Sequence, residues 1–147
     1  MNCNENLFDV ITSIEAYSFS GVSSTRTMEI HGKHVNEQEL GLSDSGRTDV
    51  PLKPKSCEPV EKPMMEIPGD SYEVTVTWTM KQVDSSTYKV LEELKEYPKH
   101  LILRTYNNKG YFIRCEENGY EFSYQEKNGE MECEVSIHNK NGIQRLL

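Results

Sequence analysis

The stretch YEVTVTWTM, residues 72–80, decides how the rest of this 147-residue sequence is interpreted. Its apolar side chains are Tyr72, Val74, Val76, Trp78 and Met80, and glutamate or threonine occupies each position between them. Successive side chains of an extended strand point to opposite faces, so a strand separates this pattern into one apolar and one polar surface. The stretch therefore predicts a strand with one face on a core.

One helix is predicted directly after this strand, over about residues 85–97. Asp84 is a good N-cap, Leu91 and Leu94 lie at helical spacing, and Pro98 cannot continue the helix. The apolar stripe is short, which favours a helix that flanks a sheet.

Four strands are predicted after the helix: HLILRTY (100–106), YFIRCEE (111–117), YEFSYQE (120–126) and MECEVSIHN (131–139). Turns that contain glycine separate them, which is typical of an antiparallel meander. Alternation places Tyr120, Phe122 and Tyr124 on one face of the third strand. It also places Cys133 on the apolar face of the fourth, so Cys133 and Cys115 are expected to be small core residues.

The N-terminal part fits two interpretations. Residues 7–19, LFDVITSIEAYSF, have apolar side chains at spacings that suit either a strand or a helix, and the strand is favoured. Residues 22–35 suit a second, partly exposed strand, which would complete an N-terminal hairpin. Together these elements predict a mainly β (α+β) fold: an antiparallel β-sandwich or open barrel with one flanking helix and a long extended loop.

Residues 35–71 are predicted to be that loop, an extended proline-rich arm within a single domain of residues 1–147. A connection of this length without its own secondary structure is usually functional or disordered. Proline-rich chain is stiff, at ~3.1 Å per residue, so the arm could reach beyond the domain. Its apolar side chains are the predicted subunit-interface residues: Leu42, Val50, Leu52, Val60, Met64, Met65 and Ile67. The open alternative is a loop folded back over its own domain; under the arm hypothesis, deletion of residues 43–68 would leave a folded domain.

Charge and cysteine content exclude several classes of protein. The formal net charge is −8 and no cluster of lysine and arginine interrupts it, which argues against a specific nucleic-acid-binding protein. The first residues, MNCNENLFDV, lack the basic and apolar regions of a secretion signal, and no apolar run approaches the ~18 residues of a membrane span. Four scattered cysteines without a C-x-x-C pair are expected to stay free thiols in a reducing cytoplasm.

No catalytic, metal or cofactor site is predicted, and the protein is not expected to be an enzyme. His31 and His34 are three residues apart, which on a strand sends their side chains to opposite faces. Cys57 could add a ligand, but its spacing does not require one. The sequence SDSG, residues 43–46, is explained by turn chemistry.

Acidic residues concentrate towards the C-terminus. Residues 116–134 contain seven glutamates, and Lys127 is their only basic residue. Glu132 and Glu134 share one strand face, and with Glu121 they form a candidate one-signed surface. Tyr17, Phe19 and Tyr106 are candidate interface aromatics because alternation does not place them inside.

The C-terminal half resembles small structural proteins of tailed bacteriophages. The resemblance lies in the order YEVTVTWTM, a helix through LEELKEYP, then HLILRTYNNKGYFIRC, GYEFSYQEKNGEMECEVSI and a final IQRLL. Such proteins form rings in the tail tube or head-to-tail connector, notably in the crAss-like group of phages. The resemblance covers about half of the chain.

The resemblance implies a virion structural protein that is made in the host cytoplasm. It would form a homo-oligomeric ring with other phage structural proteins around a DNA channel, with the arm on neighbouring subunits and the acidic surface facing the lumen. The alternative is a small phage-encoded binding module that inhibits or modulates a host protein.

Overall fold

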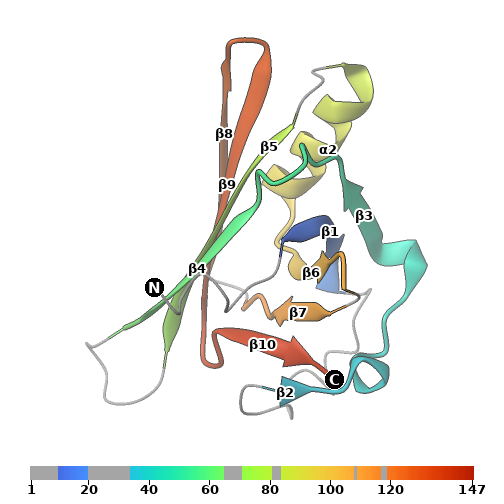
Figure 1. The fold of residues 1–147 in the computed structure, drawn as a ribbon, viewed down its shortest axis with the longest axis vertical. Coiled ribbons are helices and arrows are strands. Elements are labelled where there is room, and N and C mark those ends of the chain that lie inside the picture. Colours follow the sequence, from blue (N-terminus) through green and yellow to red (C-terminus); the bar gives the residue numbers. More distant parts are fainter. Residues whose placement is uncertain (1–9, 20–33, 65–70, 81–83, 108, 117–118) are drawn as a thin grey trace.

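The computed structural model describes residues 10–19, 34–64, 71–80, 84–107, 109–116 and 119–147. These residues form two β-sheets and one α-helix, which confirms the predicted β-sandwich with a single flanking helix. The strands of the two sheets cross steeply, so that β5 and β9 run along the long axis of the molecule while β7 and β10 run across it (Figure 1).

The first sheet has six strands in the order β2-β10-β7-β6-β1-β3. Its strands are β1 (Ile11–Tyr17), β2 (His34–Val35), β3 (Arg47–Val50), β6 (His100–Thr105), β7 (Gly110–Ile113) and β10 (Ile143–Leu146). All of its neighbours are antiparallel except β2 and β10, which are parallel.

The second sheet has four antiparallel strands in the order β4-β5-β9-β8. They are β4 (Glu58–Pro63), β5 (Tyr72–Met80), β8 (Tyr120–Lys127) and β9 (Glu130–Asn139). The stretch YEVTVTWTM forms β5, and its apolar positions from Val74 to Met80 are buried as alternation predicts. A turn at Asn128 and Gly129, both with positive φ, joins β8 to β9.

The helix α2 (Ser85–Glu96) agrees with the predicted range to within one residue. The Asp84 carboxylate caps it by accepting the Thr87 backbone N–H at 3.0 Å. Thr87, Leu91 and Leu94 turn inward, so the helix closes one side of the space between the sheets.

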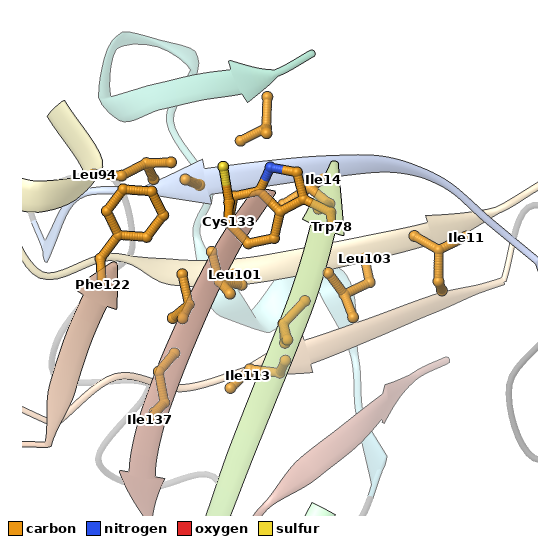
Figure 2. Packing of buried hydrophobic residues seen from close by; sticks show 14 of the residues in the cluster. Ile11, Ile14, Trp78, Leu94, Leu101, Leu103, Ile113, Phe122, Cys133 and Ile137 are labelled. Atoms are coloured by element: carbon orange, nitrogen blue, oxygen red, sulfur yellow. The ribbon is translucent and has the colours of Figure 1, made fainter. Parts of the chain in front are cut away.

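The main core lies between the two sheets, where Trp78 of β5 and Phe122 of β8 stack with ring centroids 6.0 Å apart (Figure 2). From the other side, Ile14 of β1 and Leu101 of β6 enter the same core. Cys115 and Cys133 are buried, which confirms them as core residues.

A second, smaller core lies on the opposite face of the six-stranded sheet. Ile102 of β6 and Phe112 of β7 point to this face, because their neighbours along each strand point into the main core. Val35 and Leu40 cover them, the latter from the 3-10 helix η3 (Glu37–Leu40). The start of the predicted arm therefore packs on its own domain.

The prediction of an extended arm is wrong over the described residues 35–64. After η3 come a second 3-10 helix, η4 (Asp44–Gly46), and then β3 and β4. β3 pairs with β1 and β4 pairs with β5, so the segment contributes a strand to each sheet. The alternative that this segment folds back on its own domain describes the structure.

Two other predictions need correction. The four C-terminal strands are not one meander: β6 and β7 lie in the six-stranded sheet, whereas β8 and β9 lie in the other. Residues 11–17 form the favoured strand, whose neighbours among the described residues are β3 and β6, and residues 34 and 35 pair with β10 instead of with β1. Of that range, residues 22–33 lie outside the described residues.

Candidate functional site

The solvent-facing side of the four-stranded sheet carries the clearest accumulation of chemically similar groups. The strand register determines which residues lie on this side, because residues paired across antiparallel strands point to the same face. Glu134, for example, pairs with Thr77 on one side and with Ser123 on the other. This outer sheet face consists of Glu58, Val60, Lys62, Glu73, Thr75, Thr77, Thr79, Glu121, Ser123, Gln125, Lys127, Glu130, Glu132, Glu134, Ser136 and His138.

The predicted acidic residues Glu121, Glu132 and Glu134 lie together on this face, and all three are exposed. The register adds Glu58 of β4 and Glu73 of β5, which sequence reasoning missed. Glu58 and Glu73 lie on this surface only because of which strands pair, and the sequence around each residue does not indicate that pairing.

Several basic side chains elsewhere form ion pairs, whereas these carboxylates do not. Within the described residues the ion pairs join Arg47 to Asp44 and Asp49, Lys53 to Glu130, Lys99 to Glu93, Arg104 to Glu15 and Glu37, and Arg114 to Glu116. Glu58, Glu73, Glu121, Glu132 and Glu134 appear in none of them. Only Lys62 and Lys127 are lysines of the outer sheet face itself, so the face keeps a net negative charge.

An open depression of about 470 Å³ lies on the outer sheet face over β5, β9 and β8. Hydroxyl groups of Ser56, Thr77, Thr79 and Ser123 line it together with Gln125, Glu132 and Glu134. Gln125 donates from Nε2 to Glu132 Oε1 at 3.2 Å, which orients that carboxylate. The surface is rich in hydrogen-bond acceptors and repels polyanions.

The rim of the depression is fixed by the chain that enters β4. Thr79 donates its backbone N–H to Ser56 Oγ at 3.2 Å, and Lys53 N–H donates to Thr79 O at 2.9 Å. Lys53 Nζ also lies 2.7 Å from Glu130 Oε2. Residues 53–56, which belong to the predicted arm, therefore bind the end of β5.

The predicted interface residues of the arm occupy several environments. Val50 is buried in the main core, Leu52 packs against that core, and Leu42 packs against the smaller one. Their own domain thus supplies the burial that neighbouring subunits were expected to supply. Val60 is 50 % exposed on the outer sheet face and Met64 is half-buried; Met65 and Ile67 lie outside the described residues.

The three candidate aromatics also differ. Tyr17 is 2 % exposed, so the prediction that it lies at an interface surface is wrong; its hydroxyl donates to Glu15 Oε1 at 3.0 Å. Tyr106 is 67 % exposed and Phe19 is 37 % exposed, so both reach the surface.

The weak catalytic and metal candidates are not brought together. His34 is exposed in β2, and His31 lies outside the described residues. Burial raises the pKa of the Cys57 thiol to about 12, and no group of three metal-ligating side chains forms among the described residues. SDSG forms the turn of η4, as its composition predicts.

One buried polar cluster escaped sequence analysis. His100 Nδ1 accepts the Cys115 backbone N–H at 2.9 Å, and Asn139 Nδ2 donates to Arg114 O at 2.7 Å. Burial, reinforced by the Arg114 charge, lowers the pKa of His100 to about 4, and burial raises that of the Cys115 thiol to about 12. The Cys115 thiol contacts Glu116 O at 3.4 Å, so this is a structural cluster and not an activated thiol.

Comparison with known proteins finds no matching family model, no matching curated protein and no matching solved structure. Within the described residues, no helix combines the length and apolar character needed to cross a membrane.

Proposed function

We propose that this protein is a structural subunit of a tailed-phage particle. Copies assemble into a ring in the tail or head-to-tail connector, and the outer sheet face points towards the DNA channel. The proposal joins the resemblance of the C-terminal half to such proteins with the chemistry of the four-stranded sheet.

The observation that carries the proposal is the uncompensated acidity of the outer sheet face. Glu121, Glu132 and Glu134 are exposed, take part in no ion pair within the described residues and lie among small hydroxyl side chains. Carboxylates outnumber the two lysines of this face, so a wall of this kind repels the phosphate backbone and DNA can pass without sticking.

The finding that residues 35–64 do not form an extended arm changes which surfaces could join the subunits of the ring. Because residues 35–64 pack on their own domain and contribute strands to both sheets, the described part of the chain would contact other subunits through surfaces of the folded domain. Exposed Tyr106 and the outward edge of β8 are available for this role.

The test removes the charge of the channel wall without changing its shape. In phage particles, the triple variant Glu58→Gln, Glu132→Gln, Glu134→Gln is expected to assemble normally but to deliver DNA poorly, because the wall no longer repels it. The matched control is Glu39→Gln, Glu92→Gln, Glu96→Gln, which makes the same change in net charge at exposed sites away from this face. Equal loss of assembly and delivery in the first variant, or equal effects of both variants, would contradict the proposal.

The same acidic face supports a second candidate function, a module that covers a basic surface of a host protein. Charge complementarity would then provide specificity and a fast association rate. A purified chain that stays monomeric and binds one host protein in equimolar ratio favours this candidate over the ring.

A further inference from the structure

The outward edge of β8 differs from every other sheet edge in the described part of the chain. Both edges of the six-stranded sheet are short, at two residues in β2 and four in β3. The four-stranded sheet ends in β4 on one side and in the eight-residue β8 on the other. Figure 1 shows that the β8–β9 hairpin extends to one end of the molecule's long axis.

The β4 edge is blocked by its own sequence. Pro59 and Pro63 lack backbone N–H groups, and both occupy alternate positions that pair with β5 residues on one face. Proline is tolerated in sheets where its missing donor would face solvent, so the outward side of β4 has few donors for another strand.

The turn between β8 and β9 identifies the free backbone groups of β8. Asn128 and Gly129 have φ values of 55° and 78°, as in the two-residue type I′ turn, and Lys127 pairs with Glu130 beside it. Such a turn makes the flanking pair a hydrogen-bonded one, and bonding alternates along the strand. The N–H and C=O groups of Tyr120, Phe122, Tyr124 and Glu126 therefore point outward from the sheet.

We propose that this edge pairs with β8 of a second copy of the chain, antiparallel and centred on Tyr124. In this register Glu121 lies opposite Lys127 of the second copy, and the two-fold axis repeats the pair. Ser123 then faces Gln125, and the two Tyr124 residues face each other. The contact merges two four-stranded sheets into one continuous sheet.

Charge selects this register over its neighbours. A centre at Phe122 leaves Lys127 beyond the end of the partner's strand, and a centre at Glu126 sets two carboxylates directly opposite. Opposite charges directly across a strand pair are favourable and like charges are unfavourable. Only the register centred on Tyr124 gives a partner of opposite charge to both ionic residues that β8 contributes to the outer sheet face, Glu121 and Lys127.

The inference does not rest on the proposed function. A two-fold contact closes on two copies, so a ring would need a second, head-to-tail contact as well. Dimers without rings would contradict only the ring, and rings that ignore β8 substitutions would contradict only the β8 contact.

A charge-swap set tests the register by sedimentation velocity over a wide range of protein concentration at low salt. Glu121→Lys and Lys127→Glu are each expected to weaken dimerisation about tenfold, since each turns two attractive pairs into repulsive ones. The double variant, with both substitutions, is expected to restore it. The two single variants change net charge in opposite directions, so a non-specific charge effect would move them apart.

Tyr124→Pro tests the backbone contact, because it removes an outward N–H and leaves the ladder to β9 in place. A monomer with a native circular dichroism spectrum is expected, whereas Tyr124→Thr, which keeps the N–H, should still dimerise. A folded Tyr124→Pro variant that dimerises like the wild type would overturn the inference. So would a wild type that is monomeric at every concentration, or a double charge variant that fails to recover; if Tyr124→Pro does not fold, the charge-swap set decides alone.

Discussion

The buried histidine of the polar cluster makes stability depend on pH in a way that can be isolated. His100 is 5 % exposed, its Nδ1 accepts the Cys115 backbone N–H, and its ring lies 5.8 Å from the Phe112 ring. Protonation would place a charge in this apolar site close to the Arg114 guanidinium, and it would also turn the accepting nitrogen into a donor. The folded protein therefore holds His100 neutral.

The size of the effect follows from the lowered pKa. In the unfolded chain the histidine titrates near its ordinary value of 6.5, and in the folded protein near 4. Between these values the unfolded state binds more protons, so the free energy of unfolding falls as pH is lowered. Each pKa unit corresponds to about 1.4 kcal/mol, which gives a loss of roughly 3 kcal/mol between pH 7 and pH 4.

Urea unfolding of wild type and His100→Gln at several pH values between 7 and 4 measures this contribution. Glutamine keeps an acceptor for the Cys115 N–H but does not titrate, so the variant should lose about 3 kcal/mol less than wild type over this range. Carboxylates contribute equally to both proteins and cancel in the comparison. His34→Gln, at an exposed histidine, should keep the wild-type pH dependence. Parallel pH profiles for wild type and His100→Gln would refute the reasoning.

Three further changes test the packing of the fold. Leu40→Ala opens a cavity in the smaller core and should lower the free energy of unfolding by about 2–5 kcal/mol in urea titration. Leu42→Ala, at a half-buried site, should lower it by less. Equal losses in the two variants would contradict the assigned packing. Gly129→Ala places a side chain at a φ of 78° with no atom within 4 Å, so backbone strain alone should cost about 1–2 kcal/mol, and an unchanged stability would argue against the type I′ turn. Deletion of residues 43–68 removes β3 and β4 and should abolish the near-ultraviolet circular dichroism of Trp78, whereas a native spectrum would restore the arm hypothesis.

Local sequence patterns predict secondary structure correctly where an element's own side chains determine whether it is a helix or a strand. β5 alternates without interruption, and α2 lies between the cap at Asp84 and the stop at Pro98. The apolar spacing in residues 7–19 suits a strand or a helix, with the strand favoured, and the pairing with β3 and β6 stabilises the strand.

Patterns failed where pairing between distant segments determines the structure. EPVEKP, residues 58–63, contains two prolines and shows no clear alternation, yet it forms an edge strand because β5 offers a free side and an edge tolerates proline. The chain between β7 and β8 carries a turn sequence that also suits a hairpin, so it gives no sign that the chain crosses between the sheets.

The candidate surface was partly predictable for the same reason. Glu132 and Glu134 alternate with buried Met131 and Cys133 on one strand, so their common face follows from the sequence. Glu58 and Glu73 join them only through the order β4-β5-β9-β8, which depends on contacts far apart in the chain.

The mass of the purified chain in solution tests the central claim most directly. Native mass spectrometry, combined with electron microscopy of the same sample, should find closed rings whose mass is a multiple of the 17.0 kDa chain. A single species at 17.0 kDa over the whole accessible concentration range would contradict the account of this protein as an assembly subunit.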